Sequence, residues 1–94
     1  MDVATFEKSL TQPAAPGGLP PLLEALWYDR RGDWNRAHDI TQDLSGNDAA
    51  WVHAYLHRRD GDLSNAAYWY RHAGRPMCHA SLEEEWRLIV EALL

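Results

Sequence analysis

Two histidines, four positions apart, are the residues of this chain best suited to chemistry. His53 and His57 lie on one face of any helix that contains both, because residues four apart stack one turn above the other. Two imidazoles at this spacing can bind one metal ion. Ala54 replaces the glutamate of the His-Glu-x-x-His metalloprotease motif, so the pair does not form that hydrolytic site.

A metal or ligand site on this pair needs a further donor, for which Glu24, His38 and His72 are available. Helices packed side by side would bring Glu24 close to His53. The candidate cluster comprises Glu24, His38, His53 and His57. The alternative, which we expect, is a structural role. Both imidazoles would then lie between helices and form hydrogen bonds to neighbours such as Glu24 or Tyr28, because buried imidazoles need such partners.

A second group of residues is suited to binding another protein. Trp69, Arg71 and Arg75 lie close together in the sequence, and tryptophan and arginine dominate the energetics of protein interfaces. We therefore treat them as a candidate partner-binding surface. The alternative is that Trp69 packs against the C-terminal helix, at Trp86.

Other charged residues are expected at helix ends. The pairs 30–31 and 58–59 are both Arg-Arg, and positive charge at the C-terminal end of a helix is favourable. The run 83–85 is Glu-Glu-Glu and is expected in the first turn of the last helix, exposed to solvent.

A repeated phrase indicates which elements position these residues. The segment 32–37, GDWNRA, returns as 61–66, GDLSNA, at an offset of 29 residues (61 − 32). Ala25 returns as Ala54 at the same offset. A fixed period of this length is typical of stacked helical hairpins.

Apolar residues at helical spacing predict six helices. Gly32 and Gly61 would end the first helix of each hairpin, and Asp33 and Asp62 would cap the second. Ser81 begins a capping box, followed by an apolar stripe in a helix over 81–93 that would cover the open end of the stack. The other expected ranges are 2–10, 21–31, 34–44, 49–60 and 63–73. Asn47 or Asp48 would cap the helix over 49–60.

The spaced Gly-Asp, alanine and tyrosine positions resemble the second half of tetratricopeptide repeats. The segment 66–73, AAYWYRHA, is also similar to the end of Sel-one-like repeats. The resemblance covers residues 20–76 in two degenerate units. It implies an all-α fold, a short α-α superhelix of two stacked hairpins, and a scaffold that binds a protein or peptide partner. The expected organisation is an N-terminal arm with a proline- and glycine-rich linker over 1–19, then a helical-repeat domain over 20–94.

Composition excludes several classes of function. The chain has 94 residues and a formal net charge of −5, and its nine Lys and Arg residues are interleaved with acidic ones, so we expect no nucleic-acid partner. No apolar stretch approaches the roughly 20 residues of a membrane span, and no signal peptide is recognisable, so a cytoplasmic location is expected. The single Cys78 rules out an intrachain disulfide.

The sequence thus predicts a non-enzymatic helical-repeat interaction module without a cofactor. A glycine-rich phosphate loop and a Gly-x-Ser-x-Gly nucleophile elbow are both missing. A homodimer is predicted, because two hairpin units leave apolar ends exposed. The alternative function is a small metal- or ligand-binding protein that uses the histidines and Glu24.

Overall fold

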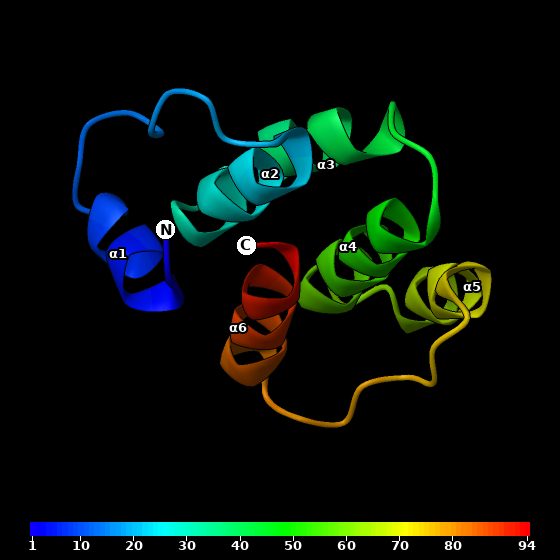
Figure 1. Cartoon of the computed structure of the whole chain (residues 1–94). Helices are drawn as coiled ribbons and strands as arrows, with labels where there is room; N and C mark the ends of the chain where they lie inside the picture. The colour runs from blue at the N-terminus through cyan, green and yellow to red at the C-terminus, as the bar shows by residue number, and fades with distance from the viewer.

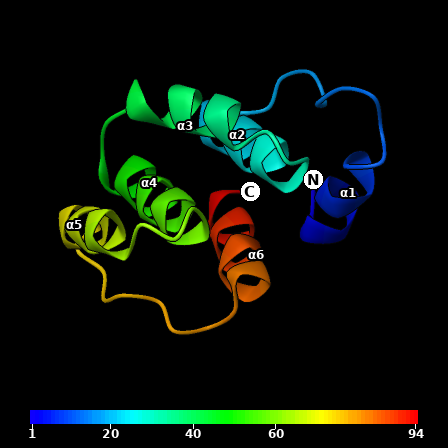
Figure 2. The same cartoon turned by 180° about the vertical axis from the view of Figure 1, so that it is seen from behind.

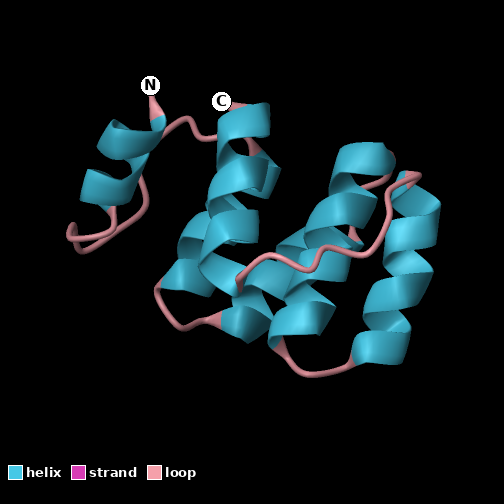
Figure 3. Cartoon of the chain, turned by 90° about the horizontal axis from the view of Figure 1, so that it is seen from below, coloured by secondary structure: helices cyan, strands magenta, loops and turns pink.

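Six α-helices and no β-strand make up the computed structural model, which describes residues 1–94 (Figures 1 and 3). The predicted all-α fold is confirmed. No helix combines the length and the apolar character that crossing a membrane requires. The helices are α1 (Val3–Ser9), α2 (Pro21–Arg30), α3 (Trp34–Gln42), α4 (Asn47–Arg59), α5 (Leu63–Ala73) and α6 (Leu82–Leu93).

The repeated sequence phrase produces two turns of the same geometry. Gly32 and Gly61 have φ angles of 86° and 81°, in the left-handed region that glycine occupies most easily. The backbone N–H of Asp33 and that of Asp62 each donate to the carbonyl five residues earlier at 2.9 Å. Each aspartate carboxylate also accepts a hydrogen bond from the N–H three residues later, so both predicted caps are confirmed.

The start of α4 differs from the prediction. Neither Asn47 nor Asp48 is the cap, because both lie inside the first turn of the helix. The cap is Gly46, which has a φ of 103° and no side chain to cap the helix, and α4 therefore begins at Asn47, earlier than expected.

The four central helices pack in chain order as two hairpins, α2 with α3 and α4 with α5, joined by contact between α3 and α4. Ala37 and Ala66, the alanines of the repeated phrase, are both completely buried. Trp34 Nε1 donates to the carbonyl of Leu56 at 2.7 Å, which fixes α3 against α4. The alanines thus stand where larger side chains would not fit.

The C-terminal helix covers a different face from the one expected. Helix α6 packs against α1, α2 and α4, whereas the backbone of α5 lies close to α4 alone and α5 reaches α6 through the Tyr70 side chain (Figure 1). Figure 2 shows the same arrangement from behind, with α1 and α5 at opposite ends of the molecule. Trp86 explains this placement, because its indole is buried and Nε1 donates to the carbonyl of Leu26 at 3.0 Å. The outer side of α5 therefore stays open.

Glu85 corrects the expectation of an exposed glutamate run. Its side chain is 1% exposed. The carboxylate accepts hydrogen bonds from the Tyr70 hydroxyl at 2.7 and 2.6 Å, from Arg58 Nη1 at 2.9 Å and from Trp51 Nε1 at 3.4 Å. We call these four residues the Glu85 cluster. It joins α6 to α4 and α5, and it gives Arg58 a buried partner that the helix-end interpretation did not include.

A second buried carboxylate joins the two hairpins. Asp29 of α2 is completely buried and accepts a hydrogen bond from the Tyr55 hydroxyl at 2.8 Å. Arg59 Nε lies 3.0 Å from the other carboxylate oxygen as an ion pair. Burial raises the pKa of Asp29, while Tyr55 and Arg59 oppose that rise. This contact occupies the side of α4 that faces α2.

The N-terminal arm is part of the packed structure. Phe6 is completely buried, with its ring centroid 5.7 Å from that of Trp86. Trp27 Nε1 donates to Ser9 Oγ at 3.1 Å, and Arg31 donates to the carbonyls of Leu10 and Gln12. The short helix α1, which would be marginal in isolation, is thus held against α2 and α6.

Candidate functional site

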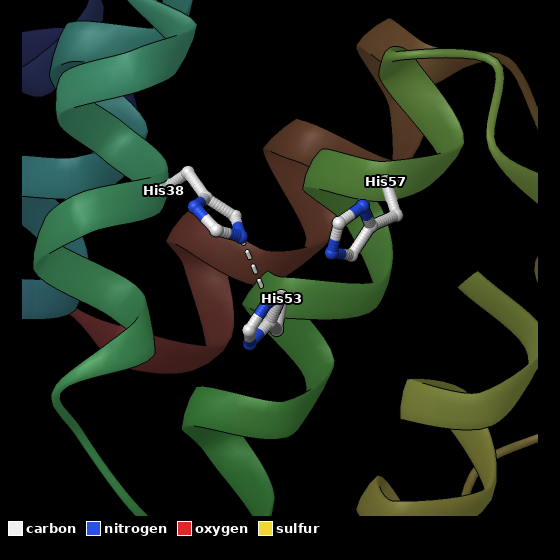
Figure 4. Close-up of side chains that lie close together, drawn as sticks. All are labelled: His38, His53 and His57. Carbon is white, nitrogen blue, oxygen red and sulfur yellow. Dashed lines mark hydrogen bonds between the residues drawn. The ribbon is translucent and has the colours of Figure 1, made fainter. Parts of the chain in front are cut away.

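Three histidines meet between α3 and α4 (Figure 4). His38 comes from α3, and His53 and His57 come from successive turns of α4. One ring nitrogen from each lies within 4.8 Å of the others. His53 Nε2 and His38 Nε2 are 3.1 Å apart and share a hydrogen bond. We call these three residues the histidine cluster.

Trp34, in the first turn of α3, positions the His38 side chain against α4. Trp34 precedes His38 by four residues, so the two side chains share a helix face. Their rings are stacked, with centroids 4.8 Å apart and planes 12° from parallel. Because the Trp34 indole is tied to the carbonyl of Leu56, it holds the His38 ring against α4.

Helix α5 contacts the histidine cluster through Trp69, which packs against His53. The Trp69 ring stacks on His53 with centroids 4.0 Å apart and an interplanar angle of 11°. His53 in turn stacks on His57 at 4.9 Å. Trp69 is partly buried by this contact and does not pack against Trp86, so the second interpretation of Trp69 is wrong.

The two α4 histidines are held in the neutral form. His53 and His57 are 7% and 8% exposed. Burial, and then the nearby His38 and His57, lower the pKa of His53 to about 4. Burial and His38 also lower the pKa of His57, against the opposing effect of Asp62 and Asp60. Neutral imidazole is the form that binds metal ions, so both rings are ready to act as ligands at neutral pH.

The distances in the histidine cluster suit a small metal ion. Imidazole nitrogens that bind zinc at about 2.0–2.1 Å in a tetrahedron lie roughly 3.3 Å from one another. The separation of 3.1 Å between the His38 and His53 nitrogens is already close to that value. The remaining separations do not exceed 4.8 Å, so tetrahedral coordination would require the His57 ring to move closer to the other two.

Glu24 does not join the histidine cluster. It lies on α2, and it forms no hydrogen bond or ion pair with any of the three imidazoles. The prediction failed because the histidines face α3, whereas the side of α4 that faces α2 carries Tyr55 and its bond to Asp29. Tyr28, the other expected hydrogen-bond partner, lies under the guanidinium of Arg36 instead.

The candidate partner-binding residues are not equally available. Trp69 is engaged with His53, and the Arg75 guanidinium lies 3.5 Å from the centroid of the Trp51 ring. Arg71 is exposed, and together with Tyr68 and His72 it lines a shallow hollow of about 270 Å³ on α5. Of the three predicted residues, only Arg71 is free of such internal contacts.

Sequence reasoning missed two features of this region. Trp34 was not associated with the histidines, although its spacing of four from His38 was a signal for contact on one helix face. A half-enclosed recess of about 310 Å³, between the α3–α4 loop and α5, also adjoins the cluster. His53 and Trp69 belong to its lining, which only the packing of α5 against α4 could reveal.

No protein-family model matches this chain, and neither a curated protein nor a solved structure matches it.

Proposed function

We propose that this protein binds a divalent transition-metal ion through His38, His53 and His57. The observation that carries the proposal is the convergence of three imidazole nitrogens within 4.8 Å, two of them on nearly buried side chains. Imidazole suits zinc, copper, nickel and iron, and zinc needs no change of oxidation state or particular d-electron geometry. Zinc is therefore the first ion to test.

A purely structural role accounts less well for the hydrogen bonding of the cluster. Each neutral imidazole has one donor and one acceptor nitrogen, and buried polar atoms normally have partners. The histidine cluster contains one internal hydrogen bond, between His38 and His53. His57 Nδ1 is buried without any partner. A metal ion would replace the hydrogen bond between His38 and His53 and give all three imidazoles a common partner.

The test is thermal unfolding of untagged protein with and without zinc. Ligand present at 100 times its dissociation constant stabilises the folded state by about 2.7 kcal/mol. We expect zinc to raise the melting temperature of the wild type and to have no such effect on His53→Ala. His79→Ala is the matched control, because His79 is exposed and lies outside the cluster. An equal rise in the His53 variant, or no rise in the wild type, would refute the proposal.

A second candidate function is a non-enzymatic interaction module, favoured by the open side of α5. This helix packs mainly against α4, and Leu63 and Tyr68 are 58% and 46% exposed. We propose a second copy of the chain as the partner to test first. Sedimentation should show a dimer for the wild type and a monomer for Tyr68→Glu, whereas a monomeric wild type would remove this assignment.

A further inference from the structure

The histidine cluster supplies three donors and no fourth. The group of residues with converging ligand atoms contains no carboxylate or thiolate. Zinc sites with three protein ligands keep an open position that water or another small molecule fills. A divalent ion held by three neutral imidazoles also keeps its full double positive charge, which favours an anion in that position.

A recess lies beside the cluster and meets it at His53. His53 belongs both to the cluster and to the lining of the 310 Å³ recess. Trp69, stacked on His53, forms an aromatic part of the wall, and His72 borders the recess from the next turn of α5. A water molecule takes up about 30 Å³ in the liquid, so the recess has room for a molecule of several heavy atoms.

The lining of the recess indicates the charge of its occupant. None of the residues that line it is acidic. Ser45 and Asn47 contribute neutral polar groups to its lining, and the first turn of α4, at the positive end of the helix dipole, borders it. Asp48 of that turn is exposed and does not line the recess. A negatively charged group therefore meets attraction from the ion and no opposing side chain in the recess.

We infer that a metal ion in the histidine cluster takes a small anion as its fourth ligand, which enters through the recess between the α3–α4 loop and α5. This inference rests on the proposed metal binding. It adds a ligand class and a route, and apart from His53 it concerns residues outside the histidine cluster.

The experiment uses cobalt(II) in place of zinc, because the visible spectrum of cobalt reports its coordination. Acetate is titrated into the cobalt-loaded, untagged full-length protein. We expect a saturable change in the cobalt spectrum. A cobalt spectrum that acetate leaves unchanged would overturn the inference while leaving metal binding intact. Failure to bind either cobalt or zinc would instead refute the proposed function.

Asn47→Asp tests the route, because it adds a negative charge to the recess without changing side-chain size. We expect it to weaken acetate binding several-fold while the cobalt spectrum without acetate stays the same. Asn35→Asp is the matched control, since Asn35 is exposed, lies in the first turn of α3 and does not line the recess. Equal acetate affinities in the two variants would show that the ligand does not enter through the recess.

Discussion

Two polar clusters on opposite faces of α4 differ in how fully their hydrogen bonds are made. In the Glu85 cluster a single carboxylate accepts bonds from Tyr70, Arg58 and Trp51. In the histidine cluster the only hydrogen bond joins His38 and His53, and His57 Nδ1 has no partner. A saturated cluster has nothing left to offer a ligand, whereas an unsaturated one does.

Because their hydrogen bonds are made to different extents, the two clusters should also contribute differently to stability. A buried carboxylate with a charged partner is costly to disrupt, because removing it leaves the other charge buried and unpaired. Neutral imidazoles in van der Waals contact with aromatic rings lose little when replaced by groups of similar shape. Mutations at the two clusters should therefore lower the free energy of unfolding by different amounts in the absence of metal.

Glu85→Ala should have the largest effect. It leaves Arg58 and Tyr70 without their buried acceptor, and breaking a buried ion pair costs about 3–5 kcal/mol. Urea unfolding measures the loss. Glu83→Ala is the control, because Glu83 is exposed and should change stability by less than about 0.5 kcal/mol. Similar stabilities of the two variants would mean that Glu85 is solvated in the protein.

Tyr70→Phe should have a smaller effect at the same cluster. It removes one donor to Glu85 while Arg58 and Trp51 remain, so we expect a loss of about 1–2 kcal/mol. Tyr68→Phe, on the exposed face of the same helix, should be close to neutral. Denaturant midpoints of the two variants make the comparison, and equal midpoints would contradict the role of the Tyr70 hydroxyl.

The local elements of this fold were predictable from sequence because their signals are local. Glycines with positive φ, aspartate caps and the Ser81 cap act within a few residues of the turns they shape. The spacing of Glu85 from Leu82 and Ile89 also placed it on the apolar stripe of α6. The run of three glutamates nevertheless suggested a solvent-exposed helix start, which is correct for Glu83 and Glu84 but not for Glu85.

The composition of the histidine cluster could not be predicted because it depends on helix packing. His53 and His57 were identified together by their spacing, but Glu24, His38 and His72 were equally available as third donors. The choice was made by the face of α4 that meets α3, and that face is fixed by long-range contacts such as Trp34 with Leu56. Similarly, the docking of α6 on α2 rests on Trp86 and Leu26, 60 positions apart in sequence.

The dependence of stability on pH below 6.5, measured without metal, should further distinguish the histidine cluster from the Glu85 cluster. The pKa of His53 is lowered to about 4, mainly by burial, against 6.5 for an ordinary histidine. Between these values the unfolded chain binds more protons than the folded protein, so the free energy of unfolding should fall as pH falls from 6.5 towards 4. Urea midpoints at pH 7, 6 and 5 test this. In His53→Gln the fall should be smaller, and an unchanged fall would assign it to other groups.

His57→Phe should have the smallest effect and is the sharpest test of the comparison. The substitution keeps a planar ring beside Trp34 and His53 and removes a buried nitrogen that has no hydrogen-bond partner. Replacing a polar group by an apolar one of similar shape is nearly neutral when no bond is lost, so metal-free stability should change by less than about 1 kcal/mol. Zinc should no longer raise the melting temperature, because one of the three ligands is gone. A large loss of stability in the absence of metal would instead show that His57 holds α3 and α4 together, and that both polar clusters of α4 are structural.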